Sequence, residues 1–150
     1  MSNSAVISTR KNYDNHGIGI YLYTHGSREE VEAFLAYCKM KGYRDLNFDN
    51  SYGMARLVQV IANYIGGVLS IGIAPCDNLG GYDTDNGVYL VDGWDVFEHF
   101  GRFVTDHQDK PTPPANMIDM LVKIDQSQPE FEQLGEDTIR LKALGNSFSF

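Results

Sequence analysis

The spacing of apolar residues changes at Ser27, and this change requires a fold in which a strand leads directly into a helix. Residues 17–25, GIGIYLYTH, alternate between two sides as the residues of a β-strand do. Ser27 and Glu30 form an S-x-x-E capping box, which satisfies two backbone amides at the start of a helix. The residues that follow have the stripe of an amphipathic helix, formed by Val31, Phe34, Leu35 and Cys38.

Short apolar or β-branched runs predict the other strands of a sheet. Residues 137–142 alternate like a late strand, and residues 93–107 fit either a strand or a helical turn. The clearest runs lie at residues 5–9, 68–74 and 88–91, and we expect the first to pair antiparallel with residues 17–25.

Helical spacing predicts two further helices. The second ends at Gly66-Gly67, and the third begins after Thr112 with Pro113-Pro114. Their apolar stripes are formed by Met54, Leu57, Val58, Ile61 and Ile65, and by Met117, Ile118, Leu121 and Val122.

Together these elements predict an α+β fold. We expect an antiparallel sheet with two helices packed on one face, followed by a C-terminal extension of helix and strand. With 150 residues the chain has the size of one domain. We divide it into a core of about residues 1–108 and an extension of about residues 109–150, with a loose tail from Asn146.

The charge is acidic and unevenly distributed. The formal net charge is −8; residues 1–60 hold seven Lys/Arg and six Asp/Glu, whereas residues 61–150 hold five and fourteen. The acidic part would repel a nucleic-acid backbone, which disfavours direct binding of DNA or RNA. It fits either a surface that keeps the protein soluble or one that competes for a basic groove on a partner protein.

Composition also limits the environment and the chemistry. No apolar run approaches the about 20 residues that a membrane span needs, and we see no signal peptide. The two cysteines and four histidines lack the spacing of a metal site, so we expect no metal and no cofactor. Cys38 falls on the apolar helix stripe, whereas Cys76 falls in a loop and is the cysteine worth testing as a nucleophile.

The junction Tyr23-Thr24-His25-Gly26-Ser27-Arg28 is the strongest candidate for a site. Free amides and the dipole at a helix start attract anions, so a phosphate or a carboxylate could bind there. Thr24 and Ser27 would add hydroxyl groups, Arg28 a cation and His25 a titratable ring. The alternative is purely structural: Ser27 only caps the helix and Gly26 only turns the chain.

A second group of candidates lies around the predicted second helix. Arg44 and Arg56 flank an acidic loop, and Tyr52 lies between them in the sequence. Structural ion pairs with Asp45 and Asp49 are the default for these arginines, unless they converge with His25 and Arg28 on a ligand.

An aromatic stripe is a third candidate. Alternation places Tyr21, Tyr23 and His25 on one side of their strand, and Tyr89 is a plausible neighbour. Such a stripe fits a stacking surface for a base, a dimer interface or simple packing.

Four segments, IYLYTHGS at residues 20–27, RDLNFDNSYGMARLV at 44–58, SIGIA at 70–74 and DNGVYLVD at 85–92, resemble a group of small proteins of bacteriophages and prophages. The resemblance covers about residues 17–97. Its matching positions are Tyr23, Thr24, His25, Arg44, Tyr52, Arg56 and Gly72. The resemblance implies no particular activity, but it implies a phage accessory protein that acts in the cytoplasm of a host bacterium.

We therefore expect a protein that counters bacterial defence by binding. It would sequester a small anionic, nucleotide-like signal or occlude a host defence protein, and a homodimer or higher homo-oligomer would suit either role. The expected ligand-binding residues are Thr24, His25, Ser27, Arg28, Arg44, Tyr52 and Arg56. The alternatives are a small nucleotide-processing hydrolase that uses His25 with Arg56 and Asp83, and a component of the virion.

Overall fold

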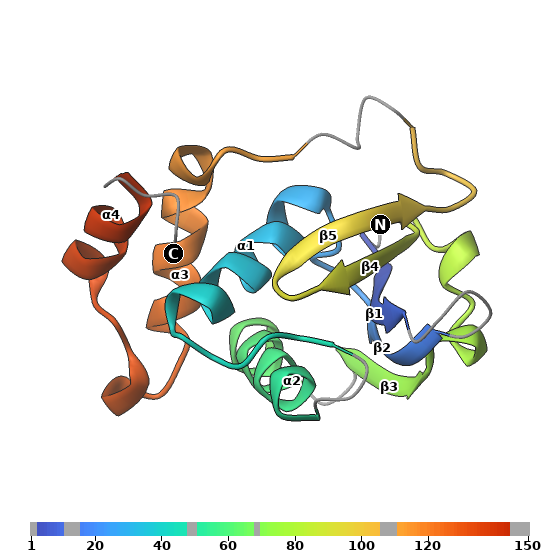
Figure 1. The fold of residues 1–150 in the computed structure, drawn as a ribbon, viewed down its shortest axis with the longest axis horizontal. Coiled ribbons are helices and arrows are strands. Elements are labelled where there is room, and N and C mark those ends of the chain that lie inside the picture. Colours follow the sequence, from blue (N-terminus) through green and yellow to red (C-terminus); the bar gives the residue numbers. More distant parts are fainter. Residues whose placement is uncertain (1–2, 11–15, 48–50, 68–69, 106–110, 145–150) are drawn as a thin grey trace.

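A five-stranded sheet forms the centre of the computed structural model, which describes residues 3–10, 16–47, 51–67, 70–105 and 111–144 (Figure 1). Its strands are β1 (Ala5–Arg10), β2 (His16–Leu22), β3 (Ile71–Pro75), β4 (Val88–Asp92) and β5 (Asp95–Phe100), in the spatial order β3-β2-β1-β4-β5. β1 occupies the middle because its residues are apolar or small on both faces, and Val6, Ile7 and Ser8 are each 0% exposed.

The sheet is mixed. β1 pairs antiparallel with β2, as the sequence predicts, and β2–β3 and β4–β5 are also antiparallel. β1 and β4 run parallel, with Val6 opposite Val88 and Ser8 opposite Leu90. The α+β class is therefore confirmed, whereas the expectation of a wholly antiparallel sheet is wrong at this pair. Local spacing shows that both segments are strands, but it does not indicate whether the two strands run parallel or antiparallel.

Helices pack against one face of the sheet, as predicted. α1 (Arg28–Met40) and α2 (Ser51–Ile65) coincide with the two predicted apolar stripes. α1 packs against α2 and, on its other side, against α3 (Ile118–Gln126), which a 3-10 turn at Pro114–Met117 precedes (Figure 1). In the described part of the chain, no helix has the length and apolarity that a membrane crossing needs.

The main core lies between the sheet and these helices. Ile7, Ile20 and Tyr89 from the sheet meet Phe34 and Leu57 from the helices, and all five are fully buried. Leu121, Ile124 and Ile139 of the C-terminal extension belong to the same apolar cluster. The extension is therefore packed into the core that it follows in the sequence.

The opposite face of the sheet is covered by a loop. Val6, Val88 and Leu90 pack there against Cys76, under two 3-10 turns at Cys76–Asn78 and Gly81–Asp83. Cys76 is 5% exposed, and burial raises the pKa of its thiol. Because nucleophilic attack needs an accessible thiolate, Cys76 is a packing residue in this structure.

Two segments that were ambiguous or misassigned are now defined. The segment of residues 93–107 contributes the strand β5, and residues 106–110 lie outside the described chain. The predicted late strand at residues 137–142 is wrong, because this segment belongs to the helix α4 (Glu136–Leu144). Ile139 and Ala143 are buried and lie four residues apart, which is the spacing of one helix face. This face packs near α3, a contact that the local sequence does not reveal. The predicted loose tail also falls outside the described residues.

A buried carboxylate fixes the extension to α1. Asp125 of α3 is 2% exposed and accepts a hydrogen bond of 2.6 Å from the Tyr37 hydroxyl. It also accepts the backbone amides of Leu134 and Gly135, at 2.7 and 3.0 Å. Three donors thus compensate the cost of burying this side chain.

Removing the Tyr37 hydroxyl should destabilise the protein measurably. We expect Tyr37→Phe to lower the free energy of unfolding by about 1–2 kcal/mol, because a bond to a carboxylate is lost inside the core. Asp125→Ala should cost more, about 3 kcal/mol or above, because it leaves three buried donors without their acceptor. Urea unfolding measures both, with the exposed Tyr82→Phe as the control. Equal stability of Tyr37→Phe and Tyr82→Phe would contradict this role.

Stability should also fall in alkaline solution. Burial raises the pKa of the Cys38 thiol above its ordinary 9.0, and burial together with Asp125 raises the pKa of the Tyr37 hydroxyl above its ordinary 10.0. Above these values the unfolded chain has lost protons that the folded chain keeps, so the free energy of unfolding decreases by up to about 1.4 kcal/mol per pH unit for each group. Urea titrations on both sides of this range measure the slope. Tyr37→Phe should flatten the decline above the ordinary tyrosine pKa, and an unchanged slope would refute the assignment to Tyr37.

Candidate functional site

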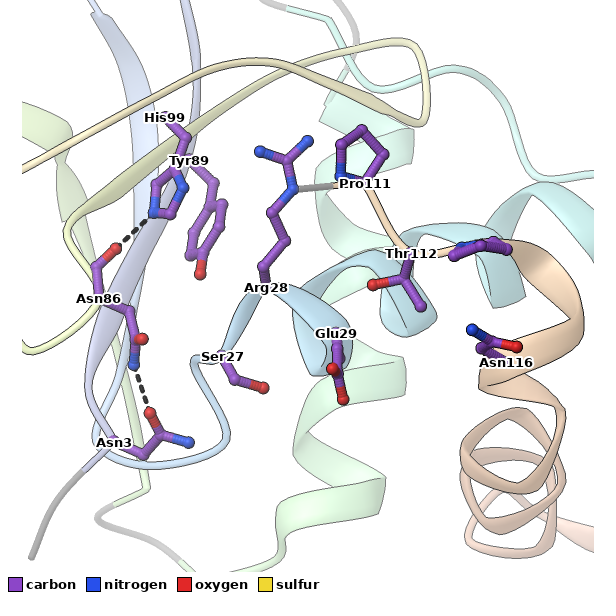
Figure 2. Close-up of a pocket in the computed structure, with 11 residues that line it drawn as sticks. Asn3, Ser27, Arg28, Glu29, Asn86, Tyr89, His99, Pro111, Thr112 and Asn116 are labelled. Carbon is purple, nitrogen blue, oxygen red and sulfur yellow. Dashed lines mark hydrogen bonds between the residues drawn. The ribbon is translucent and has the colours of Figure 1, made fainter. Parts of the chain in front are cut away.

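A pocket of about 630 Å³ lies where α1 begins, beside the β4–β5 hairpin and the segment that leads to α3 (Figure 2). Parts of the chain that are far apart in the sequence meet there. It is lined by Asn3, Ser27, Arg28, Glu29, Asn86, Tyr89, His99, Pro111, Thr112, Pro113 and Asn116.

The residues before β1 hold the pocket together. The Asn3 carbonyl accepts the Gly26 amide at 2.7 Å, and the Ser4 carbonyl accepts the Asn86 amide at 2.9 Å. A side chain at position 26 would not fit, because a Cβ there would lie 2.6 Å from both the Ala5 Cβ and the Asn3 carbonyl oxygen. The glycine between strand and helix is therefore required by close packing against β1.

A stacked pair of rings forms one wall. The Tyr89 and His99 rings lie 4.0 Å apart at 14° to each other, on neighbouring positions of β4 and β5. Tyr89 is fully buried and donates its hydroxyl to the Gly26 carbonyl at 2.8 Å. The His99 Nε2 lies 2.6 Å from the Asn86 carbonyl, so this nitrogen carries a hydrogen. Both rings are thus fixed in orientation.

Arg28 supplies the positive charge of the pocket. Its side chain is only 11% exposed, and its Nε lies 3.5 Å from the Glu32 carboxylate, one helical turn further on. The same Glu32 oxygen accepts the Thr112 amide at 2.9 Å. Figure 2 shows Arg28 rising from the start of α1 between the Tyr89–His99 pair and Pro111. Glu32 therefore connects the arginine to the segment that closes this side of the pocket.

The polar groups of the predicted anion site largely bind one another. Ser27 caps α1 by accepting the Glu30 amide at 3.2 Å, and its hydroxyl donates to the Glu30 carboxylate at 2.9 Å. The other oxygen of that carboxylate is hydrogen-bonded to the His25 Nδ1. Burial and the Glu30 charge both raise the pKa of the nearby Tyr64. The Glu30 carboxylate thus already occupies the Ser27 and His25 side chains, which the sequence predicts as donors to an external anion.

His25 also has an unusual backbone. Its φ is 63°, in the left-handed region that residues with a side chain seldom adopt. Its ring meets the edge of the Tyr64 ring, with centroids 5.4 Å apart, near the end of α2. His25 therefore faces α2, and neither it nor Thr24 is among the residues that line the pocket.

Arg44, Tyr52 and Arg56 form a separate group. The Arg44 guanidinium lies 5.0 Å from the centre of the Tyr52 ring, and both side chains are exposed. Tyr52 and Arg56 precede Tyr64 on α2 by twelve and eight residues, which places them about 18 and 12 Å from it along the helix axis. Of the seven predicted residues, the structure thus brings only Ser27 and Arg28 into the pocket.

The predicted aromatic stripe is wrong. Tyr21 lies opposite Val6 and Gly72, whereas Tyr89 lies opposite Ile7, which itself faces Ile20. Paired residues share a face of the sheet, so Tyr21 and Tyr89 lie on opposite faces. Tyr23 follows the end of β2 and is 59% exposed.

Sequence reasoning missed His99, Asn86, Thr112 and Asn116 as members of a site. Thr112 and Pro113 are predicted only as a helix start, and Asn86, His99 and Asn116 have no predicted role. The residues come from three segments, and no spacing within any one of them indicates that they share a pocket.

No three His, Cys, Asp or Glu side chains gather into a metal-binding group in the part of the chain that the structure describes. Comparisons with protein-family models, with curated proteins and with solved structures found no match. The resemblance to phage proteins stays a prediction, and the pocket is the feature of the structure that bears on function.

The two histidines should have opposite neutral tautomers. Since a carbonyl and a carboxylate only accept hydrogen bonds, His99 must carry its hydrogen on Nε2 and His25 on Nδ1. Long-range ¹H–¹⁵N NMR correlation in alkaline solution distinguishes the two forms. An Nδ1–H form of neutral His99 would contradict the described wall of the pocket.

Proposed function

We propose that this chain is a non-enzymatic binding protein for a small, nucleotide-like anion, which it holds in the pocket at the start of α1. The observation that carries the proposal is the largely buried Arg28, fixed beside the Tyr89–His99 rings in a space of about 630 Å³. Ligand pockets of proteins commonly have volumes of about 300–1,000 Å³.

The chemistry around Arg28 suits such a ligand. A guanidinium forms two parallel hydrogen bonds to a phosphate, and it does so more strongly where water is excluded. The Thr112 hydroxyl and the Asn116 carboxamide line the same space and offer donors and acceptors for the edge of a base. His99 adds a partly exposed ring whose orientation Asn86 fixes.

In the phage setting that the resemblance implies, binding alone would be a function. The protein would remove a nucleotide signal of the bacterial defence from the host cytoplasm, without turnover, as a homodimer or higher homo-oligomer. The acidic charge of residues 61–150 supports the other version, in which the protein occludes the basic surface of a defence protein. The pocket favours sequestration, because occlusion needs no cavity.

A hydrolase is the second candidate function. The structure favours His99, and not the predicted His25, as its general acid or base. His99 lines the pocket with its Nε2 hydrogen-bonded, so in the neutral ring Nδ1 is the basic nitrogen. His25 lies outside the pocket lining and is bonded to Glu30. A turnover reaction would therefore depend on His99 and not on His25.

Exchange of Arg28 tests the proposal. We expect AMP, GMP, NAD⁺ or cyclic di-AMP to bind the wild-type protein with the ligand mass unchanged, as measured by native mass spectrometry and calorimetry. Arg28→Gln should weaken binding about tenfold or more, because a charge-assisted hydrogen bond to phosphate is lost. Arg44→Gln is the matched control, since Arg44 is an exposed arginine outside the pocket.

The outcomes separate the candidates. Equal losses for Arg28→Gln and Arg44→Gln would show that the pocket is not the site. Conversion of the nucleotide by the wild-type protein but not by His99→Ala would show that the protein is a hydrolase and not a non-enzymatic binding protein. Absence of binding for all four nucleotides would refute the proposed ligand class and leave occlusion of a protein as the function to test. Thermal unfolding of each variant verifies that it is folded.

A further inference from the structure

A second cavity of about 330 Å³ adjoins the pocket along α1. Leu35, Ala36 and Lys39 form its α1 side, and Trp94, Asp95 and Val96 approach from the β4–β5 hairpin. Arg28, Pro111 and Thr112 line both cavities, so the two cavities are adjacent at these three residues. We call the two together the groove, and each cavity is one of its lobes.

Arg28 places a positive charge where the two lobes adjoin, because it lines both cavities. Arg28 is held there by Glu32, which also accepts the Thr112 amide. The Arg28 and Glu32 side chains are 11% and 16% exposed, so the arrangement is largely shielded from water. An anionic group that binds Arg28 would therefore lie between the two lobes.

Each lobe has a carboxylate and an aromatic residue of its own. The first lobe contains Glu29 with the Tyr89–His99 pair, and the second contains Asp95 with Trp94, which is 6% exposed. Lys39, which is opposite in charge to Asp95, also lines the second lobe. Exposed carboxylates repel a phosphate, but they accept hydrogen bonds from the hydroxyls of a ribose. The ends of the groove thus suit uncharged, hydroxyl-bearing groups with a ring.

We infer that the ligand is a dinucleotide, in which two nucleosides are joined through an internal phosphate or diphosphate. The linking phosphate pairs with Arg28, and one nucleoside occupies each lobe. This inference rests on the proposed function, because it names the ligand class of the same site. It adds that a mononucleotide, which carries its phosphate at one end, fills only half of the groove.

Filling the second lobe tests the inference. Ala36 is 8% exposed and lines only the second cavity, so Ala36→Met should obstruct that lobe and leave the first one open. Ala55→Met is the matched control, because Ala55 is an exposed residue of α2 outside both cavities. Asp95→Ala is a second variant that removes a proposed ribose contact without adding volume. Calorimetry with AMP, NAD⁺ and the linear dinucleotide ApA gives the affinities, and thermal unfolding verifies folding.

We expect at least one of the two dinucleotides to bind wild type about tenfold or more tightly than AMP, because two linked groups bind together. Ala36→Met and Asp95→Ala should reduce this advantage because they weaken the binding of the dinucleotide, and Ala55→Met should retain it. Similar affinities for AMP and both dinucleotides would overturn the inference and leave the proposed function standing. A dinucleotide advantage that Ala36→Met leaves intact would also overturn it, since the second nucleoside would then lie elsewhere. Absence of binding for AMP and both dinucleotides would overturn the inference together with the proposed ligand class.

Discussion

The parallel pairing of β1 with β4 brings two walls of the pocket, at the start of α1 and at the start of β4, beside each other. β1 is buried on both faces, so Asn3 and Ser4, which precede it, have fixed positions. The Gly26 amide binds one of their carbonyls and the Asn86 amide binds the other. The start of α1 and the start of β4 are thereby attached to the same two residues. A shift of one residue in this pairing would exchange the two faces of β1 and separate Arg28 from Tyr89.

The charges at the start of α1 show why a side chain, and not the helix backbone, would select an anion. The helix dipole attracts anions, but the carboxylates of Glu29 and Glu30 in the first turn already lie at its positive end. Glu30 in addition occupies the Ser27 hydroxyl and His25. Arg28 adds a largely buried charge that points away from this cluster toward Pro111 (Figure 2). Selectivity for phosphate would then depend on the geometry of one guanidinium.

Local patterns in the sequence were sufficient for α1, α2 and α3 but not for α4 or for the site. The capping box at Ser27 and the stripe from Val31 to Cys38 need only neighbours within a few residues, and both are confirmed. The face on which Tyr89 lies depends on its register with β1, far away in the sequence, and that prediction was wrong. Residues 137–142 alternate in hydropathy, yet packing against α3 selects the helix. Arg44 and Arg56 were grouped with His25 by residue type, whereas the length of α2 separates them.

The C-terminal extension takes part in both the core and the groove, which argues that the two are coupled. Asp125 fixes α3 to Tyr37 of α1, and Ile124 and Ile139 complete the main apolar cluster. The same extension carries Thr112, Asn116 and Met117 to the cavities beside α1. Because α1 carries Arg28 at its first residue and Tyr37 in its third turn, one rigid helix joins the buried carboxylate to the proposed ligand. Contacts between a ligand and Thr112 would therefore add to the forces that hold the extension on the core, and ligand binding would stabilise the whole fold.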